Sequence, residues 1–227
     1  MDGHLAVIPA RGGSTRLKDK NIAMLAGKPL INWITEAVIE SKCFDKIIIS
    51  TDNENIYSSV KHLDSNLEWH IRPDEFATTS STVLDAMLDL MRSSKNTYES
   101  FSYFLPTCPF VDPEDIRMGI GLLQDADFVV SMTQIPETIQ LACVMNGNNV
   151  LPIFDNLECG LTNSKFIKKY YKPSGAFYMG WWNKLKQTQN FFKGNVKGIV
   201  VPAERSVDIN TLEDIKYAVS FYRRSKK

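Results

Sequence analysis

The chain has 227 residues, a length that suits one domain with a sizeable buried core. It contains 26 Lys and Arg residues and 26 Asp and Glu residues, so it has no overall basic field for binding nucleic acid. No apolar run approaches the roughly 20 residues that a membrane-spanning helix needs. The totals therefore predict a globular protein that binds neither nucleic acid nor membrane, and any cationic site in it must be local.

The cysteines and histidines form no metal-binding or redox pattern. Cys43, Cys108, Cys143 and Cys159 are scattered without a C-x-x-C pair. The three histidines are equally scattered and have no zinc-binding spacing. The first apolar run meets Arg11 too soon to form the core of a signal peptide. We therefore expect a cytoplasmic protein with reduced thiols.

The first predicted strand, residues 5–10, leads into a loop rich in glycine, hydroxyl and basic side chains. The residues of this loop that suit an anion are Arg11, Gly12, Gly13, Ser14, Thr15, Arg16, Lys18 and Lys20. Glycines let a backbone approach a ligand, hydroxyls donate hydrogen bonds, and Arg and Lys supply positive charge. Spacing alone favours an anion site only slightly over a solvated basic turn, and it matches neither G-x-G-x-x-G nor a P-loop.

From residue 29 the chain alternates predicted helices and strands with short links. Helices are predicted at 29–40, 52–60, 82–91 and 112–123, and strands at 46–52, 68–71, 102–105 and 128–132. Asp52 or Asn53 is expected to cap the second helix, and Asp112 or Asp115 the fourth. This order predicts an α/β fold with a mostly parallel, Rossmann-like sheet and helices on both faces.

The alternation stops near Gln134, where segments become shorter and more polar. Within this stretch, residues 146–149 (Asn-Gly-Asn-Asn) predict a hairpin turn. The sheet resumes with strands at 176–179 and 198–201, a helix at 181–187 between them, and a final helix after Thr211. We interpret residues 1–227 as a single domain with a small inserted subdomain at about 134–175.

Three segments near the amino terminus share a pattern with a known family. They are Ile8-Pro9-Ala10-Arg11-Gly12-Gly13-Ser14, Lys20-Asn21-Ile22 and Leu25-Ala26-Gly27-Lys28-Pro29-Leu30. This pattern resembles the signature of the CMP-sialic acid synthetases, the acylneuraminate cytidylyltransferase family. The resemblance covers nearly the whole chain and is weakest at 134–170. It implies a nucleotidyltransferase fold and a homodimer in which the inserted segment forms the interface.

The resemblance implies a site for CTP. In the family the first loop wraps the triphosphate, and an arginine beside a later loop recognises cytosine. Arg72-Pro73 and Phe76-Ala77-Thr78-Thr79 resemble that later loop, with Thr79 in place of an aspartate; an ordinary surface loop is the alternative for all of it except Arg72. The implied nucleotide-binding residues are Ala10, Arg11, Gly12, Gly13, Ser14, Arg16, Lys20, Asn21 and Arg72.

The segment after the last predicted strand, Ser206 to Thr211, has two interpretations. The residues alone favour an N-cap for the final helix by Asp208, Asn210 or Thr211. The family has Asp-x-Asp here, and both carboxylates approach the metal–triphosphate, so the resemblance makes Asp208 a ligand for Mg²⁺ or Mn²⁺. Asn210 replaces the second aspartate. Its carbonyl oxygen can still bind Mg²⁺, but it brings no negative charge.

The resemblance also implies contacts to a sugar acid. The segment Pro106-Thr107-Cys108-Pro109-Phe110 resembles Gln-Pro-Thr-Ser-Pro-Leu of the family, with Leu105 in place of a sugar-contacting glutamine. Leu105 makes the pocket less polar and favours an acid with a deoxygenated tail. Cys108 is predicted to be a small buried thiol, because no histidine or second base accompanies it. The implied sugar-binding residues are Leu105, Thr107, Lys172, Tyr178, Phe191 and Phe192.

Among these residues, Tyr178, Phe191 and Phe192 also have purely structural explanations. Lys172 replaces an arginine of the family and keeps a cation that could face the sugar carboxylate. Tyr178 is equally well explained as a half-buried strand residue. Phe191 and Phe192 match an aromatic pair that relatives place across the dimer interface, and core packing explains such a pair equally well.

Together these features predict a CMP-nonulosonate synthetase. The anomeric hydroxyl of a nine-carbon 2-keto sugar acid, such as legionaminic, pseudaminic or N-acetylneuraminic acid, would attack the α-phosphorus of CTP and release pyrophosphate. Arg11, Lys20 and Asp208 are the predicted catalytic residues. A cytidylyltransferase for KDO and a non-catalytic CTP-binding homologue are the alternatives, because Thr79, Leu105 and Asn210 depart from the family pattern.

Overall fold

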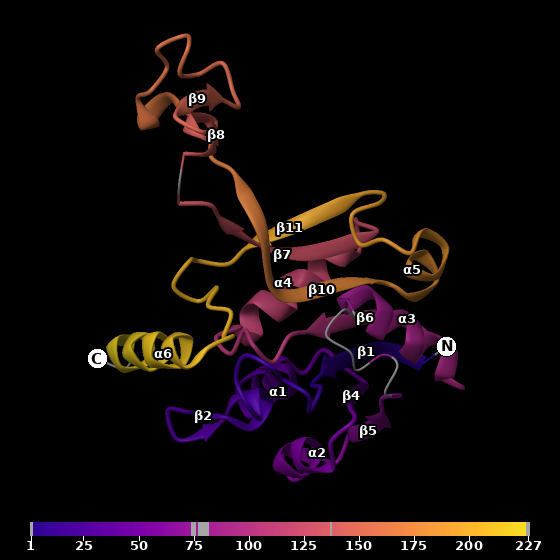
Figure 1. Ribbon diagram of the computed structural model, residues 1–227. Helices are drawn as coiled ribbons and strands as arrows, with labels where there is room; N and C mark the ends of the chain where they lie inside the picture. Colours follow the sequence, from indigo (N-terminus) through magenta and orange to yellow (C-terminus); the bar gives the residue numbers. More distant parts are fainter. Residues whose placement is uncertain (1, 74–75, 77–81, 137, 226–227) are drawn as a thin grey trace.

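A seven-stranded sheet forms the centre of the computed structural model, which describes residues 2–73, 76, 82–136 and 138–225 (Figure 1). Its strands are β1 (Asp2–Pro9), β4 (Lys46–Thr51), β5 (Leu67–Ile71), β6 (Tyr98–Phe104), β7 (Phe128–Gln134), β10 (Tyr171–Trp181) and β11 (Val196–Val200). They lie in the order β11-β7-β10-β6-β1-β4-β5. All neighbouring pairs are parallel except those of β10, which runs antiparallel to both β6 and β7. The predicted mostly parallel sheet is confirmed.

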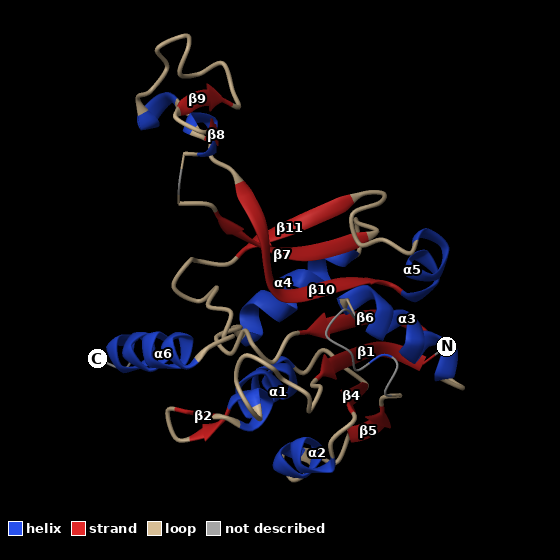
Figure 2. Cartoon of the chain, viewed as in Figure 1, coloured by secondary structure: helices blue, strands red, loops and turns tan. Residues whose placement is uncertain are grey.

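Six α-helices connect and cover these strands (Figure 2). They are α1 (Leu30–Ser41), α2 (Glu54–Val60), α3 (Val83–Ser93), α4 (Pro113–Leu123), α5 (Trp182–Thr188) and α6 (Leu212–Ser225). The Asn53 side chain caps α2, and Asp112 caps α4 in a capping box with Asp115. Each of these helices therefore begins at one of the residues predicted for it, because a side-chain acceptor there satisfies free amide groups of the first turn.

Two hydrophobic clusters fill the two faces of the sheet. The first joins residues of α1, α2 and α4 to one face, and the second joins residues of α3 and α5 to the other. A third, smaller cluster holds α6 against Leu25, Leu30 and Phe110. Since consecutive side chains of a strand point to opposite faces, Ile47 and Ile49 enter the first cluster and Ile48 the second. The helices on both faces confirm the predicted layers.

Small elements complete the fold. A short hairpin of β2 (Met24–Leu25) and β3 (Lys28–Pro29) precedes α1. Its turn is Ala26-Gly27, where both residues have positive φ, as a type I′ turn requires. Short 3₁₀ helices in the described part of the chain include η1 (Lys20–Ile22), η3 (Ile139–Leu141) and η4 (Ser164–Phe166).

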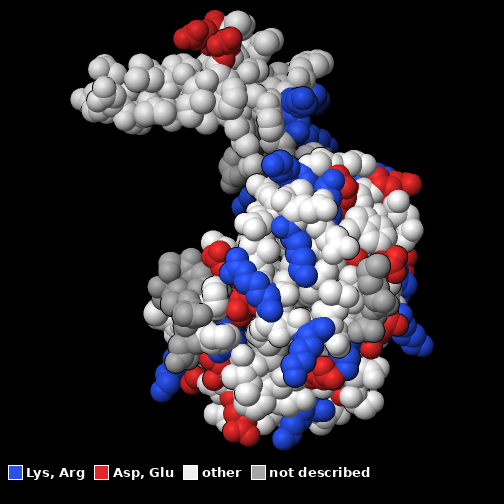
Figure 3. Space-filling view, turned by 90° about the vertical axis from the view of Figure 1, so that its right-hand side faces the viewer, with Lys and Arg blue, Asp and Glu red and all other residues white. Residues whose placement is uncertain are grey.

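The segment between β7 and β10, residues 135–170, projects from the body of the molecule (Figure 1). It carries the hairpin β8 (Cys143–Asn146) and β9 (Asn149–Pro152), whose turn lies where it was predicted. In Figure 3 its surface is mostly uncharged, with acidic side chains on its upper edge and basic side chains where it joins the body. Within the described parts of the chain, no helix is long and apolar enough to cross a membrane.

Candidate active site

Several predicted site residues meet at the carboxyl ends of β1, β5 and β6. Arg11, Arg72 and Leu105 each follow one of these strands closely. A cavity of about 150 Å³ lies between them, lined by Pro9, Arg11, Lys20, Asn21, Arg72, Thr82, Val83, Ala86, Tyr103, Leu105, Pro106 and Thr107. Open α/β sheets bind their ligands at this edge, because loops from several strands converge there.

The first loop folds back so that both of its ends reach the cavity. The Asn21 side chain is 5% exposed, and its amide nitrogen donates to the carbonyl of Arg11 over 2.9 Å. Ser14 N–H donates to the carbonyl of Gly12, also over 2.9 Å, while Asp19 adopts a left-handed conformation before η1. Arg11, Lys20 and Asn21 therefore line one wall of the cavity, as the anion-site hypothesis predicted for them.

The Gly12 amide, expected to face a ligand, has a protein partner instead. It donates to Oδ1 of Asp52 over 2.6 Å. A Cβ atom on Gly12 would lie 2.9 Å from Nδ2 of Asn53, so the close approach of the loop to the start of α2 requires glycine. Asp52 was predicted only as a helix cap, and its contact with the loop was not predicted.

Arg72 is buried without a carboxylate partner among the described residues. Its side chain donates from Nε to Ser50 Oγ over 3.3 Å and from a terminal nitrogen to the carbonyl of Ser50 over 3.2 Å. The Tyr103 hydroxyl lies close enough to Arg72 for the guanidinium to oppose the rise in its pKa. A buried cation that has only neutral partners is costly, and a ligand that brings an acceptor relieves that cost. Arg72 therefore marks the cavity as a binding site.

Tyr103 lines the cavity, although it was not among the predicted site residues. Burial raises the pKa of its hydroxyl, and the neighbouring Arg72 partly opposes that shift. Tyr103 lies directly opposite Tyr178 in the pairing of β6 with β10. Its place at the end of a buried strand was a signal that the hydroxyl would need a partner, but the partner comes from a distant part of the sequence.

The segment between β11 and α6 places polar groups against the first loop. Asn210 Oδ1 accepts from Arg16 over 2.7 Å and from Lys20 Nζ over 3.2 Å. Asn210 Nδ2 donates to Oδ2 of Asp208 over 2.7 Å. One neutral carboxamide thus joins two cations of the first loop to the Asp208 carboxylate.

The predicted helix cap and the predicted metal ligand turn out to be different residues. Thr211 Oγ1 accepts from the amide of Asp214, and the Asp214 carboxylate accepts from the amides of Asn210 and Thr211. This reciprocal pair caps α6. Asp208 is therefore not needed as the cap and stays exposed beside the two loops.

The cations of the first loop act on one another. Burial lowers the pKa of Lys20; the nearby Asp208 carboxylate opposes that shift, and Arg16 and Arg11 add to it. A polyanionic ligand would relieve this mutual repulsion, because it adds negative charge between the cations. No acidic side chain is found among the described residues that line the cavity.

The residues available for a divalent cation are few. No group of three or more His, Cys, Asp and Glu side chains in the described part of the chain could hold a metal ion. Asn210, predicted as a ligand, uses its oxygen to accept from Arg16 and Lys20 in this arrangement. Asp208 alone still fits Mg²⁺, since this ion is usually held by one or two carboxylates together with phosphates and water.

Leu105 and Thr107, predicted to contact the sugar acid, both line the cavity. The carbonyl of Thr107 accepts from the amide of Ile209 over 2.8 Å, which ties the segment of Asp208 to the end of β6. Cys108 is fully buried, and burial raises the pKa of its thiol to about 12, with Asp208 adding to the shift. The predicted small buried thiol is confirmed.

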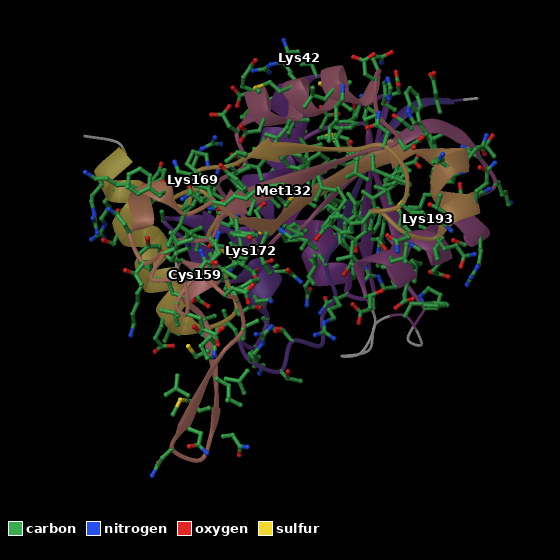
Figure 4. All side chains as sticks on the ribbon, turned by 90° about the horizontal axis from the view of Figure 1, so that it is seen from above. Lys42, Met132, Cys159, Lys169, Lys172 and Lys193 are labelled. Atoms are coloured by element: carbon green, nitrogen blue, oxygen red, sulfur yellow. The ribbon has the colours of Figure 1, made fainter. Side chains whose placement is uncertain are left out.

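The remaining predicted sugar-binding residues lie elsewhere on the molecule. Lys172 is exposed on β10, beside Thr133 of β7, and is outside the described lining of the cavity (Figure 4). Tyr178 is half-buried, and its ring centroid is 5.0 Å from that of Phe191. Phe191 is a core residue and Phe192 is 54% exposed. For Tyr178 and Phe191 these positions match the structural alternatives, and the structure brings neither into the cavity.

The loop of Phe76 to Thr79 lies outside the described residues, apart from Phe76. A larger hollow of about 430 Å³ is lined by α1, α6 and the start of α4, but its cations already have partners. In it Lys28 pairs with Glu36, and Arg205 pairs with Asp115. The smaller cavity is therefore the better candidate, because the buried Arg72 that lines it pairs with no carboxylate in the described part of the chain.

Comparisons with known proteins identify similar proteins and a family. The sequence profile of a family described as cytidylyltransferase matches residues 5–161. The chain is 28% identical to the pseudaminic acid cytidylyltransferase of Campylobacter jejuni, over 97% of this chain and 96% of that protein. It is 31% identical to the CMP-N,N'-diacetyllegionaminic acid synthase of Legionella pneumophila, over 91% of this chain and 90% of that protein.

One further curated protein and one solved structure are also similar to the chain. The N-acylneuraminate cytidylyltransferase of Escherichia coli is 30% identical over 98% of this chain and 53% of its own length. The solved structure of CMP:2-keto-3-deoxy-manno-octonic acid synthetase complexed with CTP superposes with a TM-score of 0.71. That structure covers 99% of this chain and is 16% identical to it, so it supports the architecture alone.

Proposed function

The chain belongs to the cytidylyltransferase family of nucleotidyltransferases, and on that basis we propose that it is a CMP-nonulosonate synthetase. It would transfer CMP from CTP to the anomeric hydroxyl of a nine-carbon 2-keto sugar acid and release pyrophosphate. The relatives named for pseudaminic, legionaminic and N-acylneuraminic acids support this class of acceptor.

One observation carries the proposal. The cavity at the carboxyl ends of the strands brings Arg11 and Lys20 together with the buried Arg72, and no acidic side chain is among its described lining. Such a cavity suits a ligand that is both polyanionic and rich in hydrogen-bond acceptors, as CTP is. A solvated basic turn, the alternative for the first loop, would leave these cations exposed to water instead.

The protein would act mainly by positioning its substrates and by stabilising charge. Lys20 and Arg11 would hold the triphosphate and stabilise the negative charge that develops on the phosphoryl oxygens as the sugar hydroxyl attacks in line. Arg72 would hold the nucleoside end of CTP. Mg²⁺ or Mn²⁺, held by Asp208, would neutralise phosphate charge when bound. Asn210 would hold the first loop, through Arg16 and Lys20, at a set distance from Asp208.

The acceptor is the finer part of the proposal. Leu105 lines the cavity together with Val83 and Ala86, so this part of the wall is apolar. An apolar wall accepts a deoxygenated carbon more readily than a hydroxyl, because it offers the hydroxyl no hydrogen bond. We therefore favour legionaminic or pseudaminic acid over N-acetylneuraminic acid.

The assembly is also a proposal. The exposed apolar side chains of the projecting segment, such as Val150 and Phe166, support a homodimer that covers them. Exposed Lys172 and Phe192 lie on the adjoining β10 and the loop before β11, where a partner could reach them. The substrates and the family chemistry fit a cytoplasmic enzyme that supplies activated sugars for cell-surface polysaccharides.

The test is pyrophosphate release with CTP, Mg²⁺ and a panel of acids that includes legionaminic, pseudaminic, N-acetylneuraminic and KDO acids. We expect turnover with at least one nine-carbon acid and a preference for a deoxygenated one. Turnover with KDO alone would support the alternative acceptor. Binding of CTP without pyrophosphate release from any acid would support a non-catalytic homologue. A preference for N-acetylneuraminic acid would overturn the role given to Leu105.

A further inference from the structure

A continuous chain of hydrogen bonds runs behind Arg72, away from the cavity. Arg72 Nε lies 3.3 Å from Ser50 Oγ, and Ser50 Oγ lies 3.0 Å from His70 Nδ1. His70 Nε2 lies 3.2 Å from Ser93 Oγ, whose hydroxyl reaches the carbonyl of Asp89 over 3.0 Å. The proposed reaction gives no role to Ser50, His70 or Ser93.

The fold brings these residues together from three separate elements. Ser50 on β4 pairs in register with His70 on the neighbouring β5. Both side chains therefore point to the same face of the sheet, the one that α3 covers with Ser93. Ser50 is 2% exposed, so water cannot readily replace its side-chain partners. The chain of hydrogen bonds thus links α3 to the cavity; it is buried at Ser50 and reaches the surface at Ser93.

A donor and an acceptor can be assigned to each hydrogen bond in this chain, and all the bonds run in the same direction. A guanidinium can only donate, so Ser50 Oγ accepts from Arg72 and has its own proton to give. His70 Nδ1 is the acceptor within reach, which assigns the neutral imidazole with its proton on Nε2. That N–H donates to Ser93, and Ser93 donates to the carbonyl of Asp89. Burial lowers the pKa of His70, with Arg72 adding to the shift and Asp89 opposing it, which agrees with a neutral ring.

We propose that Ser50 and His70 are positioning residues that hold the Arg72 guanidinium in place for the nucleotide. Arg72 donates to the hydroxyl and to the carbonyl of Ser50, so Ser50, itself hydrogen-bonded to His70, helps to determine where these donors point. An arginine side chain has considerable rotamer freedom, and a pre-oriented one loses less entropy when the ligand binds. Recognition of CTP thereby depends on His70, although that residue is outside the described lining of the cavity. This inference rests on the proposed binding of CTP.

The experiment measures CTP affinity of the full chain by calorimetry in the presence of Mg²⁺. Ser50→Ala and His70→Phe should each weaken binding about tenfold, the effect of losing one hydrogen bond in a chain that ends on a charged group. His70→Asn, which keeps an acceptor near the position of Nδ1, should restore affinity to within about threefold of the wild type. His62→Phe, at an exposed histidine after α2, is the matched control and should bind as the wild type does.

A double-mutant cycle separates positioning from general loss of packing. Arg72→Lys keeps a cation but lacks the Nε–H that reaches Ser50, so Ser50→Ala should weaken binding no further in that background. Full additivity of the two effects would overturn the proposal. So would a change of less than about threefold for both Ser50→Ala and His70→Phe, or equal loss in His70→Asn and His70→Phe.

Two further outcomes are distinguishable. Thermal denaturation of each variant shows whether it is folded at the temperature of the measurement. If His70→Phe is not folded, Ser50→Ala and the double-mutant cycle with Arg72→Lys still test the proposal. Wild-type protein that binds no CTP would overturn the proposed function and this inference together. Wild-type protein that binds CTP, with variants that bind equally well, would overturn the inference alone.

Discussion

The cavity end of the sheet and the projecting segment are built in opposite ways. At the cavity, hydrogen bonds join residues far apart in sequence, such as Arg16 to Asn210 and Ile209 to Thr107, above a filled core. In the projecting segment, Met145, Val150 and Phe166 are each more than half exposed. The first region is therefore held by the body of the protein, whereas no described residue of the projecting segment belongs to a hydrophobic core cluster. The residues proposed to bind the nucleotide are therefore positioned by contacts within one chain.

The largest expected effect comes from the cation that the cavity partly buries. Lys20→Ala should lower turnover by roughly 10²–10³-fold, because one preorganised donor to the phosphoryl oxygens is lost. Initial rates of pyrophosphate release would measure it. Lys18→Ala, an exposed lysine of the same loop, is the matched control and should stay near the wild-type rate. A loss below threefold for Lys20→Ala, in a folded protein, would remove Lys20 from the catalytic group.

The next effect concerns the carboxamide that joins the two loops. Asn210→Ala should weaken CTP binding by about tenfold, because Arg16 and Lys20 lose their shared acceptor. Asn210→Asp keeps the acceptor but places a second carboxylate beside Asp208. It should therefore bind CTP less well than the wild type in EDTA and regain affinity as Mg²⁺ is added.

Calorimetric titrations with and without Mg²⁺ would check both variants. Equal metal dependence of the wild type and Asn210→Asp would show that the charge at this position does not influence the metal. Thr211→Ala, which affects only the cap of α6, serves as a control for changes in helix stability.

A smaller effect compares one thiol from each region. The pKa of the buried Cys108 thiol is about 12, whereas Cys159 is exposed in the projecting segment. At pH 8 only about one Cys108 thiol in 10⁴ would be ionised, and burial also blocks access of the reagent. Iodoacetamide followed by mass spectrometry should therefore label Cys159 first and Cys108 last. Early labelling of Cys108 would show that the cavity wall opens readily.

The smallest expected effect on stability is in the projecting segment. Phe166 is 85% exposed, so Phe166→Ser should change the free energy of unfolding by less than about 0.5 kcal/mol. If this segment forms the predicted dimer interface, the same substitution should lower the dimer fraction in sedimentation velocity. Tyr217→Ser, on the exposed side of α6, is the control. A dimer that is unaffected by Phe166→Ser would place the interface elsewhere.

Much of the fold could be predicted because its signals are local. Apolar residues at helical or strand spacing predicted the helices and strands of the sheet, and short polar residues predicted the caps at Asn53 and Asp112. The antiparallel direction of β10 was not predicted, since strand direction depends on the path of the chain between β7 and β10. Phe191 likewise suited both core and interface until the structure placed it against Phe101 and Phe128.

The features of the site likewise fall into those predictable from local sequence and those that depend on the tertiary structure. The sequence by itself determined the glycine-rich basic loop, the cations Arg11 and Lys20, and the buried thiol of Cys108, because residue type and short spacing carry that information. Arg72 was predicted from the family resemblance. Only the tertiary structure decided that Asp52 binds the Gly12 amide, that Asn210 joins Arg16 and Lys20 to Asp208, and that Ser50, His70 and Tyr103 surround Arg72. The physical reason is that a polar side chain needs a partner when it is buried, but which partner it finds depends on how distant strands come together.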